Sequence, residues 1–277
     1  MNISGDILIS TTPYASIVAI LDSSGVPIKL RAELKGKESK VGDIWVGKVS
    51  RPVPGHKASF VSLGKGNEGI LAGNIRPGKP LLVQIVRDSF GGKGPKLTTL
   101  PNYAGRYLVF SPHIEKDMVS RGISDISIVK DLLNLLGKLN RPVGGFIARR
   151  LAARASKEEL ISEAKALILR SEISNQKVNN FIHPSIVESA GGLIGNVLRE
   201  LASVGNSIWF DNYKSYEEAL NQAKECAPVL IPNMQMDSND GIFSFFDMQT
   251  QYRKSLDSIV LLPSGGKITI EENIACV

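Results

Sequence analysis

The chain has 277 residues, of which 43% are hydrophobic and 22% carry a charge. This length and composition predict two or three globular domains, and no internal repeat or low-complexity run is present. The net charge of +6 favours a polyanionic partner, although so small an excess is also a common solubility feature.

The sequence carries no targeting or membrane signal. No stretch reaches the apolar length of a membrane-spanning helix, and the opening MNISGDILIS lacks the basic start and apolar core of a signal peptide. A cytoplasmic location is therefore expected. Cys226 and Cys276 form no CxxC pair, and the three histidines lack ligand spacing. We expect buried thiols and no metal site.

Residues 6–34 alternate apolar and polar side chains in three runs, DILIS, ASIVAILD and PIKLRAEL, with turn residues between them. This alternation predicts a three-stranded antiparallel meander. A unit of that size is too small to fold alone. The lysine-rich linker GKESK follows it.

Five short strands are expected between residues 41 and 100, in DIWVGKV, KASFVSLG, EGIL, PLLVQIVRD and KLTT. Short strands with Gly and Pro corners are typical of a small barrel. Gly64, Gly66 and Gly69 spell the dinucleotide-binding pattern GxGxxG, but that pattern needs a following helix. Because ILAGN comes next and is typical of strand and turn, we predict a hairpin loop.

Helical spacing of apolar residues begins after residue 127. IVKDLLNLLGKL is expected to be a helix and VGGFIARR a buried strand, which together indicate an α+β layer. Ser156 and Glu159 form a capping box before a further helix, ELISEAKALILR.

Two more helix starts are predicted downstream. Pro184 suits the first turn of a helix over residues 185–201, and Ser215 with Glu218 opens another helix. DMQTQYRKSL is expected to be helical, and SIVLLPSGGKITIEE predicts a hairpin around PSGG.

Two small groups of residues are candidates for binding. Phe60 on a barrel strand and Lys93 in the GGKGPK loop could offer a stacking ring and a phosphate-seeking ammonium to one single strand of nucleic acid. The alternative is that Phe60 is core and Lys93 a solvated loop residue. Arg149 and Arg150 could grip a phosphate monoester, or be surface charge only. No carboxylate pair stands out for Mg²⁺, so no catalytic residue is assigned.

Several segments, in order, resemble one known family: VGDIWVGKVSRPVPGHKASFVSLGKGNEGIL, GGKGPKLTTLPNYAGRYLVFSP, RGIS, GFIAR and LPSGGKITIEE. Together they are similar to the N-terminal half of ribonucleases E and G and to the related AU-rich RNA-binding proteins. The order and spacing of KGPKLTT, GRYLV and LPSGG are the specific part, and the resemblance covers nearly the whole chain.

The resemblance implies a multidomain fold of mixed α/β and β class. A ribonuclease-H-like α/β domain, split between residues 1–38 and 205–277, would be interrupted by two insertions. The first would be a five-stranded OB-fold RNA-binding barrel at residues 39–100. The second would be an α+β domain of the 5′-sensor type at residues 101–204.

Binding residues are also implied by the resemblance. Phe60 matches the family's base-stacking aromatic residue and Lys93 its RNA-contacting lysine. Ile70 stands where the family has a second aromatic residue. Because isoleucine offers no π-face, weaker RNA binding is expected.

In the sensor-like region, Gly105, Val109 and Arg149 match positions of a pocket for the 5′-phosphate, and Arg150 replaces a threonine there. Asp125 falls where an arginine is usual, and its carboxylate would repel a phosphate.

The resemblance further implies that the sequence stops a few residues before the family's first Mg²⁺-binding aspartate. We therefore expect single-stranded RNA binding in RNA processing or decay, with no catalytic residue and no cofactor in this chain. Mg²⁺ would belong to the family's catalytic subdomain. Two alternatives stay open: the N-terminal part of an active Mg²⁺-dependent endoribonuclease, and a non-catalytic interaction module that docks onto RNA-decay proteins. The oligomeric state is not predicted.

Overall fold

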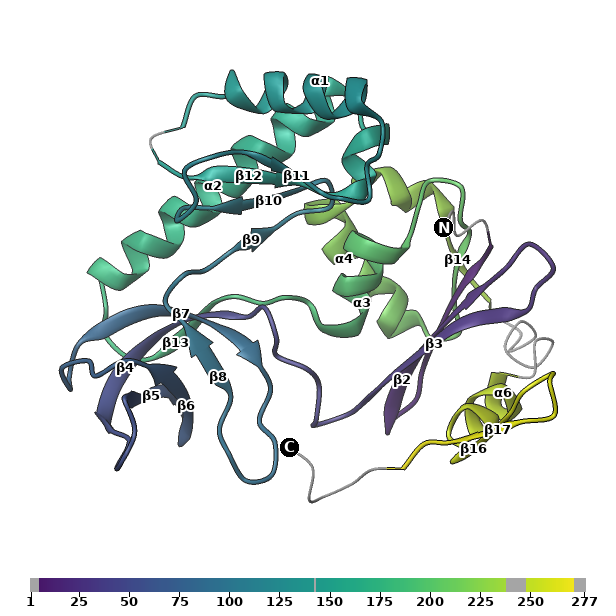
Figure 1. Ribbon diagram of the computed structural model, residues 1–277, viewed down its shortest axis with the longest axis horizontal. Helices are drawn as coiled ribbons and strands as arrows, with labels where there is room; N and C mark the ends of the chain where they lie inside the picture. Colours follow the sequence, from purple (N-terminus) through teal and green to yellow (C-terminus); the bar gives the residue numbers. More distant parts are fainter. Residues whose placement is uncertain (1–4, 142, 238–247, 272–277) are drawn as a thin grey trace. The chain divides into compact units, whose positions relative to one another are not determined.

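The computed structural model describes residues 5–141, 143–237 and 248–271 (Figure 1). The chain divides into two compact units. The first unit consists of residues 1–37, 202–221 and 229–277, and the second of residues 38–201 and 222–228.

The first unit is built on a five-stranded sheet with the strand order β15-β14-β1-β2-β3. The predicted meander is confirmed as β1 (Ile7–Thr11), β2 (Ala15–Leu21) and β3 (Pro27–Leu34), which pair antiparallel. Parallel to β1 lies β14 (Ile208–Phe210), and parallel to β14 lies β15 (Met234–Met236). The sheet therefore joins strands from both ends of the sequence, whereas its ribonuclease-H-like character stays a prediction.

Helix α4 (Tyr213–Cys226) begins two residues before the predicted Ser215. The Asn212 side-chain oxygen accepts a hydrogen bond from the backbone N–H of Lys214 at 2.9 Å, which is the role of an N-cap residue. The Ser215 hydroxyl instead donates to the backbone carbonyl of Asn212 at 2.8 Å. The predicted helix is confirmed, but its cap was assigned to the wrong residue because two polar side chains compete for that position.

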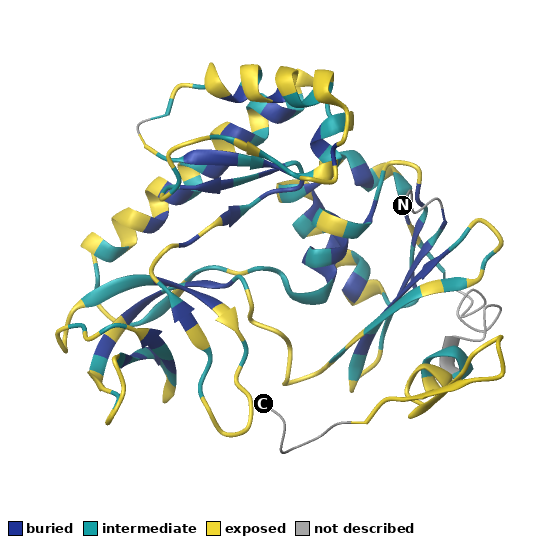
Figure 2. Ribbon diagram, in the orientation of Figure 1, coloured by how far each residue is buried: buried dark blue, intermediate teal, exposed yellow. Residues whose placement is uncertain are grey.

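The predicted helix and hairpin near the C-terminus are present as α6 (Met248–Ser255) and the antiparallel pair β16 (Ile259–Leu261) and β17 (Lys267–Thr269). Gly265 closes the hairpin with a φ of +85°, a conformation that glycine adopts without strain. Both strands are exposed along their length (Figure 2). No helix among the described residues is long and apolar enough to cross a membrane.

The second unit contains a closed five-stranded barrel, as predicted. Its strands are β4 (Ile44–Pro52), β5 (Ala58–Gly64), β6 (Asn67–Ala72), β7 (Pro80–Arg87) and β8 (Lys96–Thr98). They pair in the order β4-β5-β6-β8-β7, and a further pairing of β4 with β7 closes the sheet. The barrel interior is apolar and includes Val49, Val61, Leu63, Leu71, Val83, Ile85 and Leu97.

The GxGxxG segment is the turn of a β-hairpin. Strand β5 ends at Gly64 and β6 begins at Asn67, while Gly64, Lys65 and Gly66 all have positive φ. No helix follows the turn, so the prediction of a hairpin loop is confirmed.

An α+β layer completes the second unit (Figure 1). Its four-stranded sheet consists of β9 (Tyr103–Ala104), β10 (Leu108–Ser111), β11 (Met118–Val119) and β12 (Gly145–Ala148). Its helices are α1 (Ile126–Gly137) and α2 (Lys157–Asn179), and their buried faces meet Tyr103, Phe110 and Phe146 in one core. The predicted capping box at Ser156 and Glu159 is present at the start of α2.

The predicted helix over residues 185–201 is wrong in its first half. Residues Ser185–Glu188 form β13, which pairs antiparallel with β4 of the barrel. After a left-handed Gly191 with φ +74°, the short helix α3 (Gly192–Asn196) leads into a π-helical turn at Val197–Leu201. Pairing with β4 overrides the weak helical pattern of a segment that contains the β-branched residues Ile186 and Val187.

The expectation of buried thiols holds only in part, because Cys226 is half-buried. Cys276 lies outside the described residues. Burial raises the pKa of the Cys226 thiol above its ordinary value.

Candidate functional site

The outer face of the barrel presents Phe60 to solvent. Along β5, Ser59, Val61 and Leu63 are buried, whereas the alternate residues, Phe60 among them, are half-buried. Phe60 is absent from the barrel core. The alternation of a half-buried strand therefore places this ring on the outside, in line with the binding hypothesis rather than with the core alternative.

Four residues stand in register across this face, one from each of four neighbouring strands. Arg51 of β4 pairs with Phe60, Phe60 with Ile70 of β6, and Ile70 with Lys96 of β8. Arg51 and Lys96 are exposed, and Phe60 and Ile70 are half-buried. We call this row, Arg51, Phe60, Ile70 and Lys96, the platform.

Arg51 covers the ring of Phe60. Its guanidinium carbon lies 4.4 Å from the ring centroid, which is a cation–π contact. The same guanidinium pairs with the Glu68 carboxylate at 2.9 Å, and the Arg51 side chain remains 59% exposed. The platform thus has an apolar centre and a cation at each end. Sequence reasoning missed Arg51, because strict alternation would place it on the same face as buried Val49, and only the β-bulge between the two residues sets Arg51 opposite Phe60.

The loop between β7 and β8 ends beside the platform. Phe90 and Lys93 exchange two backbone hydrogen bonds across Gly91 and Gly92, which both have positive φ, as in a tight type I′ turn. A side chain on Gly94 would come within 2.3 Å of the Glu68 carbonyl, so only glycine permits this close approach to β6.

This turn displays an aromatic ring that sequence reasoning missed. Phe90 is 77% exposed, and Lys93 next to it is exposed as well. A phenylalanine in the glycine-rich run SFGGKG was the available signal, because such a position has no core to enter. Together with the platform, the turn offers aromatic and cationic groups on neighbouring strands and loops.

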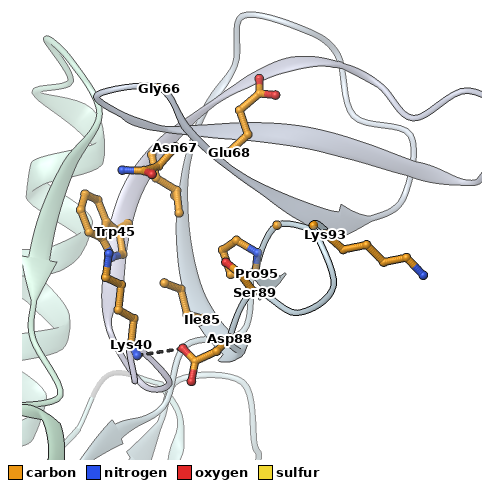
Figure 3. Close-up of a pocket in the computed structure, with 13 residues that line it drawn as sticks. Lys40, Trp45, Gly66, Asn67, Glu68, Ile85, Asp88, Ser89, Lys93 and Pro95 are labelled. Atoms are coloured by element: carbon orange, nitrogen blue, oxygen red, sulfur yellow. Dashed lines mark hydrogen bonds between the residues drawn. The ribbon is translucent and has the colours of Figure 1, made fainter. Parts of the chain in front are cut away.

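A pocket of about 400 Å³ lies between this loop and the β5–β6 hairpin (Figure 3). Lys40, Trp45, Asn67 and Asp88 line it, and the backbone of Lys93 contributes to its wall. The Lys93 side chain extends away from the pocket (Figure 3). Phe60 is not among the lining residues, so the platform and the pocket are separate features.

The residues predicted to bind a 5′-phosphate are partly brought together. Arg149 follows β12, and its Nη1 donates to the carbonyl oxygen of Gly105 at 2.8 Å. Val109 lies on β10, which pairs with β12. Arg150 is exposed, and its aliphatic stem lies near Gly122. Arg149 and Gly105 are therefore in direct contact. The Arg150 side chain does not take part in this contact.

The Arg149 guanidinium already has an anionic partner. Its Nη2 donates to Oε1 of Glu200 at 2.7 Å. Glu200 lies on the π-helical turn Val197–Leu201. Burial raises the pKa of the Glu200 carboxyl. The hydrogen bond and charge of Arg149, together with a hydrogen bond from Asn196 and the charge of Arg199, outweigh burial and lower that pKa below its ordinary value. Sequence reasoning missed Glu200, since no local pattern links residues so far apart in the chain.

A second carboxylate shapes the Gly105 turn. Glu163 of α2 accepts hydrogen bonds from the backbone N–H groups of Arg106, Tyr107 and Leu108 at 2.6, 2.8 and 2.7 Å. A side chain on Gly105 would lie 2.5 Å from the Glu163 carboxyl carbon. Burial raises the pKa of the Glu163 carboxyl, against the effect of these three N–H donors.

Comparison with known proteins identifies the family. The family model described as the ribonuclease E/G family matches residues 102–277, which is more than half of the chain. The chain belongs to the ribonuclease E/G family.

Ribonuclease G of Escherichia coli strain K12 is 29% identical over 301 residues, covering 98% of this chain and 61% of that protein. Ribonuclease G of Haemophilus influenzae is 26% identical over 297 residues. Ribonuclease E of Haemophilus influenzae is 28% identical over 280 residues, covering 92% of this chain and 30% of that protein. The chain thus spans about 60% of the length of the ribonuclease G relatives it matches.

Asp125, which stands where the ribonuclease E/G resemblance implies an arginine, has a defined structural role. Its carboxylate caps α1, accepting hydrogen bonds from the Ser127 backbone N–H at 2.8 Å and the Ser127 hydroxyl at 2.7 Å. The Ser127 hydroxyl and the backbone donors lower the pKa of the Asp125 carboxyl. An aspartate at this position is accounted for by helix capping.

The ribonuclease E/G resemblance implies Mg²⁺ in the family's catalytic subdomain. Within residues 5–141, 143–237 and 248–271, no three His, Cys, Asp or Glu side chains gather in a way that could hold a metal ion.

Proposed function

We propose that this member of the ribonuclease E/G family binds single-stranded RNA across the outer face of its barrel and acts in RNA processing. The observation that carries the proposal is the platform. A half-buried aromatic ring stacked with a guanidinium, with a lysine in the same row, suits a base that stacks on this pair with its phosphates near cations. Phe90 and Lys93, in the adjacent turn, extend the same chemistry.

The platform offers stacking and charge but no pattern of fixed donors and acceptors for base edges. Binding should therefore tolerate many sequences and weaken with salt, because neutralised phosphates release counterions. An interaction module that touches RNA little would show neither property.

The test is fluorescence anisotropy with a 3′-labelled, unstructured RNA oligonucleotide and the whole 277-residue chain. Phe60→Ala should weaken binding by roughly tenfold, since a stacked base contributes about 1–3 kcal/mol. Tyr14→Ala is the matched control, because that ring is 81% exposed and lies in the other unit. Absence of RNA binding at low salt would refute the proposal and favour the interaction module.

We further propose that Arg149, positioned by the Gly105 carbonyl, binds the 5′-terminal phosphate of the RNA. The support is the guanidinium held against the Gly105 carbonyl, since a forked donor suits phosphate oxygens. Arg149→Ala should weaken binding of 5′-monophosphorylated RNA more than of 5′-hydroxyl RNA. Lys130→Ala removes an exposed positive charge from α1 and serves as control. Equal losses for both RNAs would indicate general electrostatics instead.

We propose that these 277 residues do not cleave phosphodiester bonds on their own. The purified chain with added Mg²⁺ should leave labelled RNA intact. Metal-dependent cutting that survives repeated purification would contradict this and support the endoribonuclease alternative.

A further inference from the structure

The Arg149 site contains its own anion. One arm of the guanidinium donates to the Gly105 carbonyl at 2.8 Å and the other to the Glu200 carboxylate at 2.7 Å. The two side chains are 23% and 38% exposed, so an incoming ligand can reach the pair from solvent. A terminal phosphate that binds the second arm, Nη2, has to displace Glu200 first.

The backbone around Glu200 is held in place, which separates this pair from a chance surface contact. Glu200 lies in the π-helical turn Val197–Leu201, and single π turns are rare and frequent at functional sites. The side chain of Arg106, only 2% exposed, donates through Nη1 to the Leu198 carbonyl of this turn. Arg199 donates in turn to the carbonyl of Ala190.

Arg106 links both halves of the site. It directly follows Gly105, whose carbonyl holds one arm of Arg149, and its own guanidinium anchors the turn that presents Glu200. The chain segment that positions Arg149 therefore also fixes the carboxylate that neutralises it.

The charges differ between the resident anion and the expected ligand. A carboxylate carries one negative charge, whereas a phosphate monoester carries about −1.5 to −2 at neutral pH and offers three acceptor oxygens. A terminal phosphate can replace Glu200 on the exposed arm of Arg149 with a net gain. A neutral 5′-hydroxyl group cannot, and a singly charged phosphodiester gains little.

We infer that Glu200 is a displaceable counter-ion that makes the Arg149 site selective for a doubly charged terminal phosphate over neutral or singly charged 5′ ends. This inference rests on the proposed binding of the RNA 5′ end by Arg149. Glu200 is a specificity-determining residue in this account, and it competes with the ligand instead of contacting it.

The opposing possibility is that Glu200 only orients Arg149. Glu200→Gln separates the two, because glutamine has nearly the same shape and still accepts a hydrogen bond from the guanidinium, while the negative charge is lost. Loss of a competitor strengthens binding of charged ends. Loss of an orienting partner leaves binding unchanged or weakens it.

The experiment measures dissociation constants of the full chain for one RNA carrying a 5′-monophosphate, a 5′-methylphosphate or a 5′-hydroxyl group. For Glu200→Gln we expect roughly three- to tenfold tighter binding of both phosphorylated RNAs and unchanged binding of the hydroxyl RNA. The preference for monophosphate over methylphosphate should shrink. Glu172→Gln, which removes a negative charge from an exposed position of α2, should change none of these values.

Two further measurements keep the outcomes distinct. Thermal unfolding checks that Glu200→Gln folds. The double variant Glu200→Gln with Arg149→Ala should bind phosphorylated RNA no more tightly than hydroxyl RNA. One outcome overturns the counter-ion role alone: a preference for phosphorylated over hydroxyl ends that needs Arg149 but does not increase in Glu200→Gln. If neither the native chain nor Glu200→Gln distinguishes the three ends, end binding itself is refuted, and the inference falls with it.

Discussion

Replacing Ile70 by phenylalanine should tighten the binding of single-stranded RNA. Ile70 sits between Phe60 and Lys96 in the platform, half-buried on the outer face of the barrel. Directly opposed residues on antiparallel strands have Cβ atoms about 4.5–5.5 Å apart, so a new ring would lie next to Phe60. The outer face leaves room for its edge, because neither neighbour in the row is fully buried.

The magnitude follows from one additional stacked base. Base stacking on an aromatic side chain contributes about 1–3 kcal/mol, and each 1.4 kcal/mol is about tenfold in affinity. Part of the gain is offset because Arg51 and Glu68 occupy the same surface. We therefore expect a gain of roughly five- to twentyfold for Ile70→Phe.

Anisotropy titrations at several salt concentrations provide the assay. Stacking involves no phosphate, so the affinity should rise at every salt concentration while the slope against log salt stays the same. Ile70→Leu is the matched control, since it keeps the volume and adds no π-face. Unchanged affinity in Ile70→Phe, in a protein where Phe60→Ala has weakened binding, would refute the idea that bases stack along this row.

Two more predictions concern the scaffold of the sites. Gly94→Ala should destabilise the barrel by about 1–3 kcal/mol, because its Cβ would lie 2.3 Å from the Glu68 carbonyl. Gly137→Ala is the control, because Gly137 is helical and an added Cβ would meet nothing within 4 Å. It should be neutral or stabilising in the same denaturant titration. Similar losses of unfolding free energy in both variants would refute the close-approach argument. The pKa of Glu200 is lowered in the folded chain, so the stability it contributes is full above the ordinary value of 4.5 and is lost as the pH falls below it. Unfolding titrations of Glu200→Gln should show a flatter acid limb than the native chain, and identical limbs would contradict the pKa direction.

Patterns of local spacing were sufficient for most of the elements. The alternation in β1, β2 and β3, the capping box at Ser156 and the glycine corners of the barrel each depend on residues close in sequence. The prediction for residues 185–201 failed in its first half because the structure there depends on a contact between residues far apart in the sequence. Ser185–Glu188 gains backbone hydrogen bonds from β4, which lies far away in the sequence, and this gain is invisible in the local pattern.

The candidate sites divide in the same way. The sequence alone identified Phe60, Lys93 and Arg149, because their residue types and motifs are local properties, and the family resemblance joined them. Only the tertiary structure set Arg51 over Phe60 and Glu200 against Arg149. Register across a closed barrel and a π turn anchored by a buried arginine decide those contacts, and both depend on packing between distant segments.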